Sequence, residues 1–260
     1  MQAFLRTYSD TSLQSPMDAA VVIPTVLRPV LREALDSVFA QRFHGRIHVL
    51  IGIDNIAGDL AMLDAACAAR PSHIAVQAYW PGYSTSARHG GLTPPGDGGA
   101  LRCVLTHLAN SPFVAYLDDD NWWGPDHLFQ MRQAIDLAEW SFALRWFVHP
   151  VRRRPVCVDV WESVGPGQGM FQANFGGFVD PSCLMLNKVA CPTAALRWNF
   201  PLRNDPMSAD RSVFDLLSRH HRVRGTGQAS VYYTLNPRDG LHPLRLQRMG
   251  AAYDQVERFE

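Results

Sequence analysis

The chain has 260 residues, of which 47% are hydrophobic and 18% charged, which suits a globular protein of one large domain or two small ones. Lys and Arg together number 24, as do Asp and Glu, so the formal net charge is zero and nothing in the bulk electrostatics favours a nucleic-acid partner. The five cysteines are scattered and include no CxxC pair, which argues against a disulfide framework or a zinc knuckle and favours a reduced, cytoplasmic setting.

The sequence carries no targeting or membrane signal. Residues 1–18 form a polar lead-in, and the chain nowhere contains an uninterrupted apolar run of about 18 residues. We therefore expect neither a signal peptide nor a transmembrane segment. The expected location is the cytoplasm, with attachment to the inner face of the membrane as the alternative.

Strands alternate with helices over the first half of the chain. Apolar runs predict buried strands at residues 19–24, 47–53, 73–79 and 113–117. Apolar residues at helical spacing predict helices at residues 29–41, 60–69 and 99–110. This alternation favours βαβ units with a parallel sheet, in which ligands bind beyond the C-terminal ends of the strands. At that edge we expect Thr25, Asp54 and the cluster Asp118–Asp120 to converge.

The stretch that organises the chain is an apolar strand that ends in Asp118, Asp119 and Asp120. Adjacent carboxylates repel one another, and a divalent cation is the simplest group that neutralises them. The alternative is a solvated acidic turn that caps the next helix. Upstream, a loop rich in glycine and proline carries Arg88, which either reaches a phosphate or carboxylate bidentately or is a solvated loop arginine.

The second half has weaker patterns. Helices are predicted at residues 125–139, 212–219 and 243–258, with a short one from 188. Strands are predicted at residues 141–148, 156–160 and 179–186. The turn at 152–154 holds three arginines, which fit a solvated hairpin tip better than a membrane anchor. The final helix is expected to pack on the core or on a second subunit, as in a homodimer.

Four short motifs follow one another at regular intervals: Val21–Thr25, Asp54–Asn55, Ala87–Gly91 and Tyr116–Trp123. In order and approximate spacing they resemble the family 2 (GT-A) glycosyltransferases, and the resemblance is clear over residues 19–140. It implies an α/β GT-A fold, with a mostly parallel, mixed central sheet flanked by helices.

The resemblance also implies the domain organisation. A single domain would cover residues 19–240, with a nucleotide-sugar-binding half at 19–123 and an acceptor half at 124–240. A helical tail would follow at 241–260.

The resemblance implies contacts with a nucleoside-diphosphate sugar. Pro24 and Thr25 would line the base and ribose pocket, Asp54 would accept a hydrogen bond from the nucleobase, and Arg88 would face the base or the diphosphate. Gly177 would border the donor sugar, together with its neighbour Gly176.

Metal ligands follow from the same resemblance. Asp118 and Asp120 match the DxD motif, with Asp120 as the more direct ligand of Mg²⁺ or Mn²⁺. Hard oxygen ligands, a divalent cation and a diphosphate form a chemically consistent set. Asp119 is assigned to the donor site but could also face away from it, and His242 would complete the metal shell from the C-terminal side.

An acidic general base completes the implied site. Asp210 matches its position at the start of a helix better than Asp205 does, and Asp180 is a further candidate contact. The base would take the proton of the acceptor hydroxyl as that oxygen attacks the anomeric carbon. We thus predict metal-dependent, inverting glycosyl transfer to an acceptor hydroxyl that the sequence leaves unknown. The alternatives are a nucleotidyltransferase of related fold and a non-catalytic nucleotide-sugar-binding module.

Overall fold

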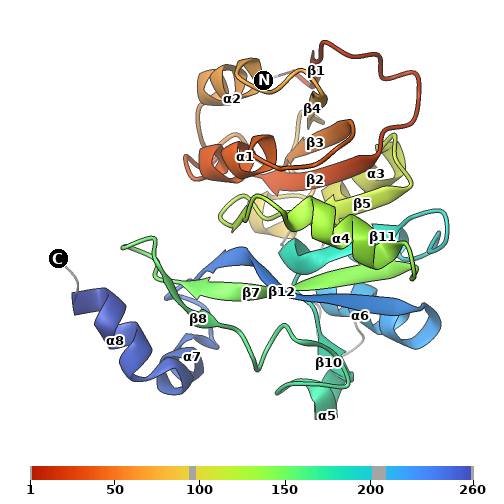
Figure 1. Cartoon of the computed structure of the whole chain (residues 1–260). Helices are drawn as coiled ribbons and strands as arrows, with labels where there is room; N and C mark the ends of the chain where they lie inside the picture. The colour runs from red at the N-terminus through yellow and green to blue at the C-terminus, as the bar shows by residue number, and fades with distance from the viewer. Residues whose placement is uncertain (1, 94–97, 201–208, 259–260) are drawn as a thin grey trace.

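The computed structural model describes residues 2–93, 98–200 and 209–258 (Figure 1). Within these ranges ten strands form one sheet in the order β1-β4-β3-β2-β5-β11-β7-β12-β6, with β8 paired to β7. No helix in the described ranges is long and apolar enough to cross a membrane.

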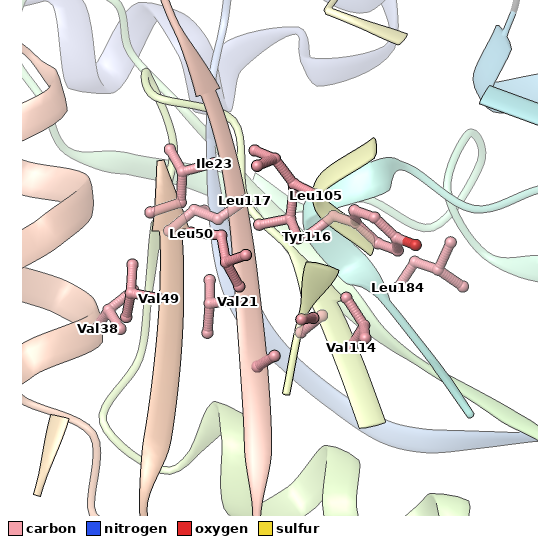
Figure 2. Packing of buried hydrophobic residues seen from close by; sticks show 14 of the residues in the cluster. Val21, Ile23, Val38, Val49, Leu50, Leu105, Val114, Tyr116, Leu117 and Leu184 are labelled. Atoms are coloured by element: carbon pink, nitrogen blue, oxygen red, sulfur yellow. The ribbon is translucent and has the colours of Figure 1, made fainter. Parts of the chain in front are cut away.

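The N-terminal half is the parallel part of the sheet. Its strands are β2 (Ala19–Thr25), β3 (Ile47–Ile53), β4 (Ile74–Trp80) and β5 (Phe113–Tyr116). All four lie within about two residues of their predicted bounds and run parallel to one another. Every residue of β2 and β3 is buried because helices cover both faces, and Figure 2 shows Val21, Ile23, Val49 and Leu50 packed side by side in this core.

Helices form two groups. The first group contains α1 (Leu31–Phe39), α2 (Leu60–Ala68) and α4 (His127–Ile135). On the opposite face lie α3 (Gly99–Leu108) and α6 (Ala209–His220) (Figure 1). Gly52 lets α3 approach β3 closely, because a Cβ atom there would lie 2.7 Å from a methyl carbon of Leu105.

The second half extends the sheet and makes it mixed. Its strands are β6 (Trp122–Trp123), β7 (Trp140–Val148), β8 (Pro155–Val158), β11 (Leu184–Asn187) and β12 (Val223–Thr234). β11 runs antiparallel to both β5 and β7, whereas β12 runs parallel to β7. β12 was not predicted from the sequence, because its first half is polar and mostly exposed and lacks the alternation that marks a strand.

Two ends of the chain differ from the prediction. The lead-in contains β1 (Phe4–Tyr8), an edge strand antiparallel to β4, where Arg6 bonds to Asp64 of α2 at 2.6 Å. The single helix predicted at 243–258 is two helices, α7 (His242–Met249) and α8 (Ala251–Arg258). Gly250 separates them because its φ of 50° and ψ of −131° are not helical.

Short elements replace two other predictions. Residues 179–186 form a 3₁₀ turn, η2 (Pro181–Cys183), before β11, and turns stand where a helix was expected from 188. The remaining short elements are η1 (Ala87–His89), β9 (Gly165–Pro166), α5 (Gln172–Phe175), β10 (Gly177–Phe178) and η3 (Ala195–Asn199).

The hairpin tip between β7 and β8 is not simply solvated. Arg153 pairs with Glu33 of α1, donates a hydrogen bond to Thr234 Oγ1 at 2.7 Å and stacks 4.5 Å from the ring centre of Trp122. The arginine therefore ties the tip to the C-terminal end of β12.

Candidate functional site

The C-terminal ends of β2, β3 and β5 meet at one edge of the sheet, as the sequence predicts. There a cavity of about 360 Å³ lies among the predicted donor-site residues; we call it the Asp54 cavity. Its lining includes Pro24, Thr25, Val26, Arg28, Asp54, Arg88, His89, Gly98, Arg102, Asp118, Asp119 and Asp120. The parallel register of the strands brings these segments together.

Asp54 is 4% exposed and holds the loop that follows β4. Its Oδ2 accepts a hydrogen bond from Ser84 Oγ at 2.7 Å, and its Oδ1 accepts from the backbone N of Thr85 at 2.9 Å and from Thr85 Oγ1 at 2.6 Å. Since a carboxylate oxygen has two lone pairs, Oδ2 keeps the capacity to accept one more bond. The same loop carries Arg88 into the cavity.

Asp119 is the structural member of the acidic cluster. It is 3% exposed, pairs with Arg28 and accepts a hydrogen bond from Thr25 Oγ1 at 2.6 Å. The Thr25 hydroxyl in turn accepts from the backbone N of Leu27 at 2.8 Å. Asp119 therefore lines the cavity but chiefly fixes the turn after β2.

Asp118 and Asp120 are the more accessible pair, with side chains 26% and 37% exposed. Asp118 pairs with Arg102, while Asp120 Oδ2 lies 3.1 Å from Arg28 Nη2, a guanidinium that Asp119 shares. Burial, together with the charge of Asp118, raises the pKa of Asp120 to about 6. Asp120 thus shares its cationic partner, Arg28, with Asp119.

These two carboxylates fit a divalent cation. Among the described residues no group of three or more His, Cys, Asp or Glu side chains is arranged to hold a metal ion. Mg²⁺ does not need such a group, because it commonly binds through one or two carboxylates, several waters and the phosphates of a substrate. Asp118 and Asp120 supply that partial set of ligands.

Arg28 and Arg102 are site residues that the sequence analysis missed. Arg102 is 4% exposed and lies on the face of α3 that also buries Leu101 and Leu105. A charged residue on a buried helix face requires a counter-charge. The position of Arg102 among apolar residues was therefore the signal by which the sequence could have indicated its pairing with a carboxylate. For Arg28 the sequence offers no comparable signal.

Two further cavities adjoin the Asp54 cavity. The Arg238 cavity, of about 480 Å³, is lined by Arg88, Asp118, Asp120, Tyr233, Thr234, Asn236, Arg238 and Asp239. The Asp210 cavity, of about 380 Å³, is lined by Arg145, Glu162, Phe171, Phe178, Asp180, Asp210, Arg211, Tyr233, Asp239, Leu241 and Arg245. Shared residues join all of them: Arg88, Asp118 and Asp120 connect the first two, and Tyr233 and Asp239 connect the last two.

The Asp210 cavity has a buried ionic wall. Arg145 is 1% exposed and lies 2.8 Å from Asp159, 2.8 Å from Glu162 and 2.6 Å from Asp180. Burial raises the pKa of Asp180, although the charge of Arg145 opposes the rise, and Asp118 adds to it. The negative charge of Asp118 thus raises the pKa of a carboxyl group in the wall of this cavity.

A second buried arginine extends the ionic wall. Arg245 binds Glu162 at 2.8 Å and Asp239 at 2.7 Å. Asp210 lies in the first turn of α6, where its Oδ1 accepts a hydrogen bond from the backbone N of Arg211 at 2.7 Å.

Two predicted residues are absent from the linings of these cavities. Gly177 has a φ of 112°, and a Cβ atom there would lie 2.3 Å from the carbonyl oxygen of Gly165, so its evident role is to permit the close pairing of β9 and β10. His242 is buried at the start of α7 with its ring edge-on to Tyr253, and it is absent from the linings of the described cavities. Asp205 lies outside the described residues.

No protein-family model matches the sequence, and no curated protein matches it. Solved structures do resemble the fold. TarS of S. aureus, residues 1–349, superimposes with a TM-score of 0.59 at 17% identity over 84% of this chain, which spans 60% of that one. The same protein in complex with UDP gives a TM-score of 0.59 at 16% identity, covering 92% of this chain and 69% of that one.

The mannosyltransferase PcManGT from Pyrobaculum calidifontis, in complex with GDP-Man and Mn²⁺, is also similar. Its TM-score is 0.56 at 13% identity, over 97% of this chain and 67% of that one. These structural neighbours are glycosyltransferases of the GT-A type, and at such identities the likeness establishes architecture. The chain therefore has the GT-A fold, a mixed α/β sheet with a parallel N-terminal half flanked by helices.

Proposed function

We propose that the chain is a glycosyltransferase that moves a sugar from a nucleoside-diphosphate sugar to an acceptor hydroxyl, with inversion at the anomeric carbon. The observation that carries this proposal is that the Asp54 cavity shares lining residues with the Arg238 cavity, which in turn shares lining residues with the cavity that Asp210 lines. Similar folds were solved with UDP and with GDP-Man and Mn²⁺, which supports a nucleotide-sugar donor.

In this proposal the donor lies along the edge of the sheet. Asp54 keeps one acceptor position toward a nucleobase, and Pro24 and Thr25 line the pocket beside it. Arg88 and the pair Asp118 and Asp120 then face the diphosphate. Asp119 acts indirectly by fixing Thr25 and Arg28.

Asp118 and Asp120 would hold Mg²⁺ or Mn²⁺. When bound there, the ion neutralises the charge that develops on the departing nucleoside diphosphate. The protein's own part is to keep two carboxylates at the strand end with Arg102 and Arg28 behind them. His242 has no support as a third ligand in the geometry described, and we leave it out of the proposed set.

Asp210 is the proposed general base. Asp210 lines a cavity next to the one that holds Asp118 and Asp120. The base must reach an acceptor hydroxyl that attacks the anomeric carbon from the side opposite the leaving diphosphate, and this neighbouring position fits that need. The rings of Phe171 and Phe178 line the same cavity and could pack on an acceptor. This adjacency favours an enzyme over a binding module.

A panel of nucleoside-diphosphate sugars with and without Mn²⁺ tests the donor site. At least one should raise the melting temperature of the wild-type protein, and Asp120→Ala should remove the part of the rise that depends on the metal. Arg42→Gln, at a side chain that is 73% exposed and absent from the linings of the described cavities, is the control. If no donor stabilises the protein, the proposed donor site is wrong.

Turnover tests the base. Asp210→Asn should retain donor binding and lose transfer by a factor of about 10² to 10⁴, the usual contribution of general base catalysis. Transfer at the wild-type rate in this variant would contradict the assignment of Asp210. Loss of donor binding as well would point to a structural role.

A further inference from the structure

Two guanidinium groups, those of Arg88 and Arg238, line the Arg238 cavity. Arg88 enters from the loop after β4, and Arg238 from the loop after β12. The structure shows no ion pair or side-chain hydrogen bond of either group within the described part of the chain. In contrast, the acids of the same cavity are paired elsewhere: Asp118 with Arg102, Asp120 with Arg28, and Asp239 with Arg245.

Two guanidinium groups that line one cavity, and that form no ion pair among the described residues, favour an anionic ligand. Guanidinium groups bind phosphate oxygens bidentately, and two of them beside a carboxylate pair suit a diphosphate better than a single phosphate. We propose that Arg238 is a diphosphate-binding residue that acts together with Arg88. This inference rests on the proposed function, and it assigns a residue that the sequence motifs do not include.

The loop that carries Arg238 starts directly at the acidic cluster. Thr234, the last residue of β12, donates from Oγ1 to the carbonyl oxygen of Asp120 at 2.6 Å and from its backbone N to Asn121 Oδ1 at 3.0 Å. Residues 235–239 therefore leave the sheet beside Asp120. Arg238 reaches the cavity without any rearrangement of the strand.

The next residue anchors the loop. Asp239 Oδ2 accepts from Arg245 Nη1 at 2.7 Å, and its Oδ1 accepts from the backbone N of Leu241 at 3.0 Å. Its backbone N donates to the carbonyl oxygen of Asn236 at 3.0 Å, which closes a turn around Arg238. The side chain of Arg238 is thus exposed and has no ion pair within the described ranges, while its backbone is held in place.

Inorganic pyrophosphate is the sharpest probe, because it carries the diphosphate without a base or sugar. Its affinity is measured by calorimetry with and without Mg²⁺, and UDP, UMP and uridine are measured in parallel. Arg238→Gln should weaken pyrophosphate and UDP about 10- to 100-fold, the range expected when a charged hydrogen-bonding group is lost. Uridine binding should change less than twofold.

Two variants serve as comparisons. Arg88→Gln should produce a loss of similar size, whereas Arg42→Gln should leave all four affinities unchanged. Arg238→Lys keeps the charge and should lie between wild type and Arg238→Gln. Since the Arg238 side chain is exposed and forms no ion pair or hydrogen bond with the described residues, its variants should have the melting temperature of the wild type.

The outcomes separate this inference from the proposed function. If the wild type binds pyrophosphate through Arg238 but transfers sugar from no donor, the anion site is supported and the proposed glycosyl transfer is refuted. Active transfer with unchanged affinities in Arg238→Gln would refute the role of Arg238. Absence of any pyrophosphate or UDP binding by the wild type would also overturn it.

Discussion

The ion network of Arg145 gives the sharpest prediction about stability. Arg145→Met keeps much of the apolar volume and removes the buried charge that faces Asp159, Glu162 and Asp180, whose side chains are 0%, 2% and 8% exposed. Removal of one partner from a buried ion pair costs about 3–5 kcal/mol, because the remaining charge is left without compensation. We expect a loss of about 4 kcal/mol in the free energy of unfolding.

The sign of the pH dependence follows from the same network. In the wild type Asp159 has a lowered pKa: burial opposes the shift, but the charge of Arg145 and backbone hydrogen bonds outweigh it. A lowered folded pKa contributes stability above the unfolded pKa, and that contribution is lost as the pH falls. In Arg145→Met the uncompensated carboxylates take up protons in the folded state, so the variant loses less on acidification. The difference in the free energy of unfolding between wild type and Arg145→Met should therefore become smaller as the pH falls from 7.5 to 5.

Urea unfolding followed by tryptophan fluorescence at both pH values measures these quantities. Arg42→Met, at an arginine 73% exposed, is the control and should change the free energy of unfolding by no more than about 0.5 kcal/mol. A loss below about 1 kcal/mol in Arg145→Met, or a difference that does not narrow in acid, would refute the reasoning.

Two other predictions concern a buried imidazole and a glycine of the Asp54 cavity. Burial lowers the pKa of His127 to about 3, so the stability that the neutral imidazole contributes should be lost as the pH falls below about 6.5, the pKa in the unfolded chain. Between pH 7.5 and pH 5 the free energy of unfolding, measured by chemical denaturation, should fall by about 2 kcal/mol more in the wild type than in His127→Gln. Equal losses would contradict this. Gly98→Ala should lower the free energy of unfolding by about 2–4 kcal/mol, because φ is 75° and the new Cβ would lie 2.7 Å from Pro24. Gly90→Ala, at a φ of 88° with no atom close to the new Cβ, should lower it by about 1–2 kcal/mol. Equal losses in the two variants would show that the contact with Pro24 relaxes freely.

Local patterns were sufficient for the parallel half of the sheet. The runs at 19–24 and 47–53 are apolar without interruption, and only a strand covered on both faces buries every residue of such a run. Parallel register then places the residues after each strand at one edge, so Thr25, Asp54 and Asp118 come together as predicted. The polar start of β12 and the break at Gly250 depend on partners or backbone angles that periodicity does not reveal.

The sequence by itself determined where the acidic site would form, because strand direction and the polar residues after each strand are local properties. Only the tertiary structure decided which charges remain available for a ligand. Arg28 pairs with Asp119 across 91 residues of sequence, and Arg102 pairs with Asp118, while Arg88 and Arg238 line one cavity from separate loops. A carboxylate and a guanidinium interact strongly only at a few ångströms, and the topology of the chain sets that distance.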